Sequence, residues 1–183
     1  MRLPAVVLML LALLLTGCGF RLAGSRPLPA ALQTVYIDVV APYRVSEPPV
    51  ESSLRAILQR RGAQVLVAQE PGAALIRLSE LKEEREVLSI GVDGKALEFR
   101  LVTRVRYELM QDGRPLLEPG TLVATRDYSF QPEQVLAKEA EEARLREFIQ
   151  NELAELLMLR FEVQLTRPAA AAPATAGDAA PAP

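Results

Sequence analysis

Residues 97 to 109 alternate between apolar and charged side chains, and this alternation constrains the fold more than any other pattern in the chain. The apolar set is Leu97, Phe99, Leu101, Val105, Tyr107 and Leu109, and the charged set is Glu98, Arg100, Arg104, Arg106 and Glu108. Successive side chains of a strand point to opposite faces, so one face of this strand is buried and the other meets water. Such a strand is typical of an antiparallel sheet that is covered on one face only.

Short turns and further strands surround this segment. Asp93-Gly94 before it and Asp112-Gly113 after it predict tight hairpin turns. The charged run Lys82 to Glu86 cannot be core, and we interpret it as a bulged or exposed continuation of the preceding strand, facing solvent. The other strands are expected at residues 34–40, at 65–68, from 74 onward with a return at 87–90, and at 122–130.

Two segments have helical periodicity. Pro48 and Pro49 open the first helix, and Gly62 is expected just after its end. Its apolar stripe is Val50, Leu54, Ile57 and Leu58. The second helix is expected from Gln134 to about Phe161. Its apolar stripe is Leu145, Phe148, Ile149, Leu153, Leu156 and Leu157, and its polar face is Glu147, Gln150, Asn151 and Glu155.

These elements predict an α+β fold in a single domain, with two helices packed on one face of a mostly antiparallel sheet. The other sheet face is expected to carry polar and charged side chains. An amphipathic helix lying on a membrane surface is an alternative for the second helix, although its polar face lacks the Lys and Arg enrichment that such helices show.

The N-terminus predicts export and lipidation. Arg2 precedes an apolar run from Val6 to Leu15, which is too short to span a bilayer but suits a secretory signal. Residues 15–18, Leu-Thr-Gly-Cys, resemble the bacterial lipobox, whose cysteine receives the lipid. Cys18 is the only cysteine of the chain and stands at the position that the motif requires. An ordinary cleaved signal with an incidental cysteine is the alternative.

The expected organisation therefore has four parts. Residues 1–17 are a lipoprotein signal peptide, and 18–33 are the lipidated N-terminus and a tether. Residues 34–165 form the α+β domain. Residues 166–183 are rich in Ala and Pro, which predicts a disordered tail because that composition cannot bury a core.

Composition excludes several function classes. The chain has no His, which removes the commonest general base and metal ligand, and one Cys cannot form an internal disulfide or a metal cluster. The formal net charge of −2 is not that of a nucleic-acid-binding protein. The ten glycines form no phosphate-cradling cluster. We expect a protein that is not an enzyme and that needs no cofactor or metal.

Several short motifs resemble one lipoprotein family in the same order. They are residues 18–22 (CGFRL), 35–37 (VYI), 87–89 (VLS), Asp93-Gly94 with Glu98 and Phe99, 126–130 (RDYSF) and 135–139 (VLAKE). Together they are similar to the LPS-assembly lipoprotein family LptE, also called RlpB. The resemblance covers Leu15 to Arg160.

The resemblance implies a partner role. Members of this family plug the lumen of the outer-membrane β-barrel LptD, help it fold and bind lipopolysaccharide on its way to the outer leaflet. Gly19 stands where Asp would commonly signal inner-membrane retention, so the sorting rule implies an anchor in the outer membrane, on its periplasmic side. Two alternatives stay open: a free-standing envelope lipoprotein that binds another amphiphile or polymer, and a small carboxylate-dependent hydrolase.

The resemblance also implies lipopolysaccharide contacts, because cationic side chains suit the phosphates of lipid A. Lys138 matches a ligand-contacting lysine of the family, although it could be only a solvated lysine at the start of a helix. The family's second basic position is Val92 here, so this contact departs from the pattern, and Lys95 could supply the charge instead.

A third candidate group lies on the charged side of the alternating strand. Its members are Arg100, Arg104 and Arg106, joined by Arg126 from a neighbouring strand. The interleaved Glu98, Glu108 and Asp127 favour instead a solvated face with cross-strand ion pairs, or contact with the barrel wall. The apolar hairpin tip at Val87 to Ile90 could be core or could insert among barrel loops.

Overall fold

The computed structural model describes residues 27–40, 46–129 and 135–166, with the side chains of the last helix from Lys138 onward. The expected signal peptide, Cys18, most of the tether, Phe130 and the Ala/Pro-rich tail beyond Thr166 lie outside the described residues.

The strands form one mixed, mostly antiparallel sheet in the order β2-β1-β3-β4, in which β5 and β6 both pair with β4. The strands are β1 Thr34–Val39, β2 Gln64–Leu66, β3 Ala74–Ile90, β4 Ala96–Gln111, β5 Arg114–Pro115 and β6 Gly120–Ser129. Strand β1 runs parallel to β2 and β3. Strand β4 is antiparallel to β3, β5 and β6.

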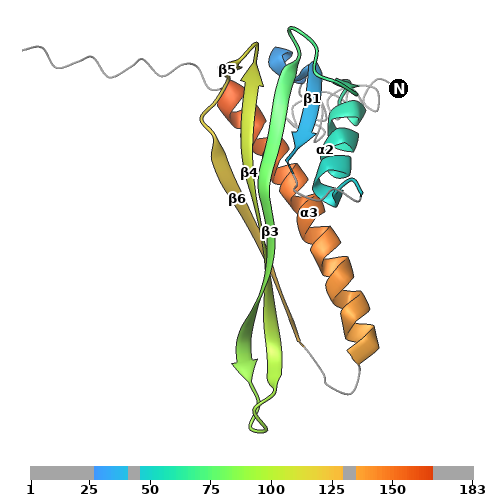
Figure 1. Ribbon diagram of the computed structural model, residues 1–183, viewed down its shortest axis with the longest axis vertical. Coiled ribbons are helices and arrows are strands. Elements are labelled where there is room, and N and C mark those ends of the chain that lie inside the picture. Colours follow the sequence, from blue (N-terminus) through green and yellow to red (C-terminus); the bar gives the residue numbers. More distant parts are fainter. Residues whose placement is uncertain (1–26, 41–45, 130–134, 167–183) are drawn as a thin grey trace, which may run out of the picture.

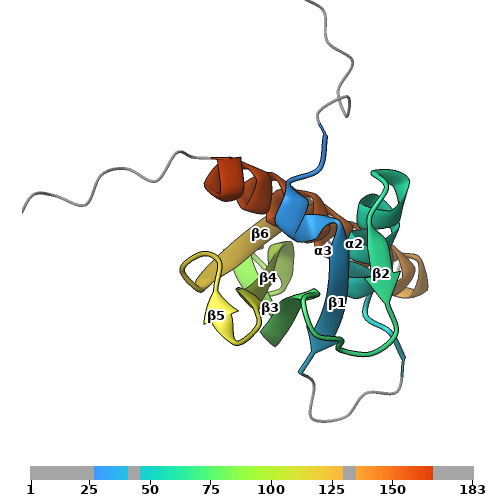
Figure 2. The same ribbon diagram turned by 90° about the horizontal axis from the view of Figure 1, so that it is seen from above.

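Both helices, α2 (Pro49–Arg60) and α3 (Val135–Thr166), cover the same face of this sheet (Figures 1 and 2). A short 3-10 helix, η1 (Ala30–Leu32), precedes β1. The predicted α+β fold class is thereby confirmed. The β3-β4 hairpin, the second half of β6 and the first half of α3 extend well beyond the other elements, so the molecule is elongated (Figure 1).

The start and end of the first helix and the two hairpin turns lie at the prolines and glycines that predicted them. Helix α2 begins at Pro49 after Pro48, and Gly62 follows it with φ +89°. Gly94 and Gly113 also have positive φ in the two hairpin turns, a conformation that L-residues with a side chain rarely adopt. This backbone conformation explains why glycine is the second residue of both Asp-Gly turns.

The hydrophobic core lies between the sheet and the two helices. Tyr107 of β4 and Phe161 of α3 are fully buried, and their rings meet edge to face with centroids 5.6 Å apart. Leu32 of η1 is also fully buried, so the packed unit includes residues that precede Thr34. The other large, fully buried side chains are Leu54, Leu58, Ile76, Leu78, Leu101, Leu109, Ile149, Leu153 and Leu157.

A bulge in β3 changes which of its side chains face the helices. The pairing with β4 shifts between Ser79 and Lys82, where Glu80 has φ 51°. Before the bulge, the even-numbered residues of β3 from Ala74 to Leu78 are buried beneath the helices. After it, Glu83 and Arg85 point toward α3. The interpretation of residues 82–86 as a bulged continuation is correct, but these two side chains are not simply solvent-facing.

Three other side chains depart from the expected faces. Phe148, placed in the buried stripe by periodicity, is 53% exposed, whereas Gln150 is buried. Gln150 is buried because α2 packs beside α3: the Val50 amide donates a hydrogen bond to Gln150 Oε1 at 3.2 Å, and Ser53 Oγ donates one to Asn151 Oδ1 at 2.6 Å. Leu97 is exposed because pairing is irregular near the hairpin tip.

Within the described part of the chain, neither helix combines the length and apolarity needed to cross a membrane.

Candidate functional site

The face of the sheet opposite the helices carries the predicted arginine row of β4. Arg100 donates to Asp127 of β6 through Nε and Nη2, at 2.8 and 2.9 Å. Arg104 donates to Glu84 of β3 at 2.7 Å. Arg106 lies 3.7 Å from Glu108 of the same strand. The structure thus brings these three arginines together on one face, and each has an acidic partner.

Register explains this arrangement. Arg100 lies directly opposite Asp127 on β6 and Glu86 on β3, so opposite charges meet across the strands. The hydrogen bond from Arg100 lowers the pKa of the Asp127 carboxyl below its ordinary value. Because these pairs are open to water, each contributes little to stability. The outer face of the sheet is therefore a solvent-exposed surface on which positive and negative side chains are paired.

Arg126 does not join this row, contrary to the sequence-based expectation. It lies opposite Leu101, which is buried, so its side chain points to the helix-covered face. There its Nη2 is 2.8 Å from Glu152 of α3, and its guanidinium lies 5.2 Å from the Phe148 ring centroid. Neighbouring residues of a strand point to opposite faces of the sheet, so the register between β4 and β6 decides whether Arg126 shares a face with Arg100 or with Leu101. The sequence alone does not give that register.

The two predicted lysines lie at the same end of the molecule, where Figure 1 shows the hairpin tip and the start of α3. Lys95 Nζ is 3.4 Å from Asp93 Oδ2, and its side chain is 63% exposed. Lys138 Nζ is 2.6 Å from Glu141 Oε2, and its side chain is only 16% exposed. Lys95 is thus the more accessible cation, while Lys138 is largely covered.

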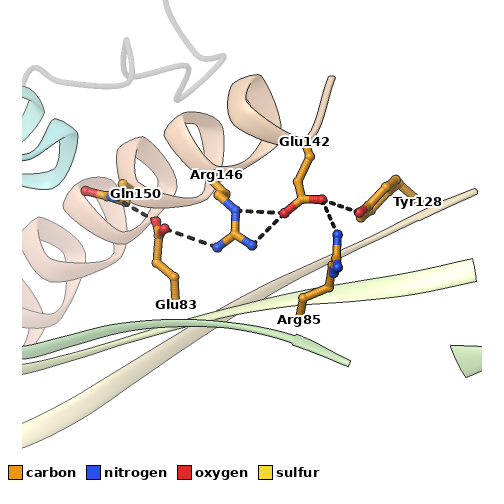
Figure 3. A network of polar contacts seen from close by, with 6 residues as sticks. All are labelled: Glu83, Arg85, Tyr128, Glu142, Arg146 and Gln150. Carbon is orange, nitrogen blue, oxygen red and sulfur yellow. Dashed lines mark hydrogen bonds and ion pairs between the residues drawn. The ribbon is translucent and has the colours of Figure 1, made fainter. Parts of the chain in front are cut away.

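A polar network that sequence reasoning missed joins α3 to the sheet (Figure 3). The carboxylate of Glu142 accepts a hydrogen bond from Tyr128 Oη at 2.5 Å and from Arg85 Nη1 at 3.0 Å. Arg146, one turn further along α3, donates to it through Nε at 3.1 Å and Nη2 at 2.6 Å. Burial raises the pKa of the Glu142 carboxyl, but the donors around it outweigh burial, so that the pKa lies below its ordinary value of 4.5.

The same network continues toward α2. Arg146 Nη1 donates to Glu83 Oε2 at 3.1 Å, and Gln150 Nε2 donates to Glu83 Oε1 at 2.8 Å (Figure 3). Gln150 Oε1 in turn accepts a hydrogen bond from the amide of Val50 in the first turn of α2. Burial and the hydrogen bond to Glu142 raise the pKa of the Tyr128 phenol. The network holds the extended hairpin, β6 and both helices in one arrangement.

Only one contact of this network could have been predicted from the sequence. Glu142 and Arg146 are four residues apart on a helix, which is the spacing of a stabilising pair. The roles of Glu83 and Arg85 depend on the bulge at Glu80, and no turn residue marks that bulge. In the ranges that the structure describes, no group of three or more Asp, Glu, His or Cys side chains is placed to hold a metal ion.

Solved structures of bacterial lipoproteins share this fold. A minor lipoprotein from Acinetobacter baumannii superposes with a TM-score of 0.59 at 22% identity, covering 72% of this chain and 92% of that one. The rare lipoprotein B from Shewanella oneidensis gives a TM-score of 0.59 at 22% identity, with 72% and 98% covered. The fold is that of these small bacterial lipoproteins.

The chain belongs to the LptE family, described as lipopolysaccharide-assembly, which matches it over residues 32–161. The LPS-assembly lipoprotein LptE of Pectobacterium atrosepticum is 29% identical over 161 residues, 87% of this chain and 85% of that protein. The protein of the same name from Photorhabdus laumondii is 30% identical over 165 residues, 90% of this chain and 85% of its own. The resemblance inferred from the short motifs is confirmed.

Proposed function

We propose that this protein is an outer-membrane lipoprotein that plugs and helps assemble the lipopolysaccharide-exporting β-barrel LptD, and that binds lipopolysaccharide during its delivery to the outer leaflet. Acyl chains on Cys18 would hold it on the periplasmic side of that membrane after residues 1–17 are removed. Its role is to bind partners and not to catalyse a reaction. Its relatives named LPS-assembly lipoprotein LptE support this proposal.

The observation that carries the proposal is the filled core. Large side chains of the sheet and both helices are fully buried against one another, which leaves the surface to meet a large amphiphile. A hollow of about 440 Å³, lined by Leu75, Met110 and neighbouring loop residues, lies at one end of the sheet and is open to solvent. A plug needs a firm core and a broad polar surface, because the lumen of a membrane β-barrel is polar.

We further propose that Lys95 and Lys138 contact the phosphates of lipopolysaccharide. Both lie at the hairpin-tip end, and each ammonium has a carboxylate within 3.4 Å that a phosphate would have to displace. The row of Arg100, Arg104 and Arg106 is the second candidate, either for the ligand or for the barrel wall. Arg126 is assigned a structural role instead, because α3 covers it.

Co-purification tests this proposal. The protein is extracted from outer membranes in a gentle detergent, and the associated protein and glycolipid are identified by mass spectrometry. We expect one large β-barrel in fixed ratio, together with lipopolysaccharide. Recovery with a different amphiphile and without any barrel would instead establish a free-standing carrier and refute the plug.

A further inference from the structure

An uncovered apolar groove runs along the C-terminal half of α3. Leu159 and Val163, four residues apart on the helix, are 59% and 53% exposed. With Leu122 of the edge strand β6, Leu156 and Arg160, they line a hollow of about 270 Å³. We call these five residues the α3 groove. Exposed apolar side chains that are scattered singly need no explanation, but a contiguous set that lines a hollow indicates a binding surface.

The chain's own N-terminal part already reaches this groove. A second hollow shares Leu159 and Val163 with the first, and Pro27 and Pro29 line its other side. Figure 2 shows η1, which follows these prolines, beside the C-terminal end of α3. The described part of the chain therefore begins beside the groove.

The composition of that preceding segment suits the groove. Residues 19–26 contain Phe20 and Leu22, which lie two positions apart and so fall on one side of an extended segment. Leu22 stands five positions before Pro27, a separation that an extended chain spans over about 17 Å, whereas Leu156 and Val163 are seven positions apart, about 10 Å along α3. The segment can therefore reach the full length of the groove.

The other end of the chain is the competing occupant. Thr166 also lines the second hollow, and residues 167–183 continue from it. That segment consists mainly of Ala and Pro and contains no large apolar side chain. Burying an aromatic and a leucine side chain gains about 1.5 to 3 kcal/mol each, and alanine offers far less apolar area to bury. The composition thus favours the N-terminal segment.

We propose that residues 19–26 dock in the α3 groove, with Phe20 and Leu22 packed against Leu156, Leu159 and Val163. Cys18 would then leave the domain at a defined place, near the C-terminal end of α3 and opposite the hairpin tip (Figure 1). Since the 17 residues of β3 extend about 55 Å, which exceeds the 40 to 45 Å of a bilayer, the anchor would direct the tip toward the far leaflet. This last consequence rests on the proposed function; the docking itself does not.

Disulfide trapping in the exported full-length protein tests the docking. Leu22→Cys is combined with Leu159→Cys in one variant and with Val163→Cys in another. The control combines Leu22→Cys with Val67→Cys, because Val67 is 96% exposed and follows β2 at the opposite edge of the sheet from β6. We expect a disulfide in most molecules of at least one groove pair and in few control molecules. Equal disulfide yields in the groove pairs and the control would overturn the proposal.

Hydrogen exchange provides a second measurement that does not depend on disulfide geometry. In bilayer nanodiscs, amides of residues 19–26 should exchange at least tenfold more slowly in the unmodified protein than in a Leu159→Ser, Val163→Ser variant. Both positions are exposed, so the fold should survive these changes, and Val67→Ser should leave exchange unaltered. Fast exchange in the unmodified protein, or protection that persists in the groove variant because the bilayer causes it, would each reject the docking. Neither experiment involves the barrel or lipopolysaccharide. A negative result would therefore refute the docking without refuting the proposed function.

Discussion

The carboxylate of Glu142 should be the most consequential charge in the described structure. We consider Glu142→Gln, which keeps the shape of the side chain and removes its charge. The variant leaves Tyr128 Oη with a neutral acceptor in place of a carboxylate, and it deprives Arg85 and Arg146 of an ion-pair partner. The side chain of Glu142 is 17% exposed, so water replaces little of what is lost.

The magnitude follows from these contacts. A hydrogen bond to a charged group contributes about 1.5 to 3 kcal/mol and a neutral one about 0.5 to 1.5, so the Tyr128 contact loses about 1 kcal/mol. The pair with Arg146 adds about 0.5 kcal/mol, and the half-exposed Arg85 adds at most as much again. We expect the free energy of unfolding to fall by about 1.5 to 2 kcal/mol.

Equilibrium unfolding in urea, followed by circular dichroism, measures this loss as a lower midpoint at an unchanged slope. The matched control is Glu84→Gln. Glu84 accepts from Arg104 at 2.7 Å, but both side chains are exposed, so the control should lose less than about 0.5 kcal/mol. If the two variants are equally stable, the network does not hold α3 to the sheet in the way we describe.

The difference between unmodified protein and Glu142→Gln should also depend on pH. The folded-state pKa of Glu142 lies below its ordinary value of 4.5, so its contribution is complete above that pH. As pH falls through the lowered folded-state pKa, the carboxylate is protonated in both states and the contribution disappears. The two unfolding free energies should therefore converge in acid, and a constant difference down to pH 2 would contradict the assignment.

Four further outcomes are expected. Cys18→Ala should leave an uncut or unlipidated protein, and an intact, unmodified Cys18 in the mass spectrum of the natural protein would end the lipoprotein interpretation. Deletion of Pro168 to Pro183 should leave the melting temperature unchanged, as a thermal scan of the truncated chain can verify. Lys95→Asp combined with Lys138→Asp should weaken lipopolysaccharide binding by tenfold or more while co-purification with the barrel persists; unaltered binding would direct attention to the arginine row. Phe161→Ala should cost about 3 to 5 kcal/mol in urea unfolding because it empties a fully buried site beside Tyr107, and a cost below 1 kcal/mol would show that the site is not packed as described.

Local patterns in the sequence were enough to predict both long helices, every strand except the short β5, and the fold class, but not the short helix η1. Alternation along residues 97–109 predicted β4 and its buried side, since strand geometry repeats every two residues. Glycines 62, 94 and 113 marked chain reversals because their backbone conformations strain other residues. The family could also be inferred, because its motifs are short, local and ordered along the chain.

What only the tertiary structure decided is which charged side chains meet. Glu80 adopts a positive φ although no glycine stands there to indicate it in the sequence. The resulting bulge turns Glu83 and Arg85 toward α3. Arg126 was assigned to the outer arginine row, yet the pairing of β6 with β4 places it under α3. A strand's own alternation says which residues share a face, but register and packing between elements decide what that face touches. Such contacts join residues dozens of positions apart, and no local pattern carries that information.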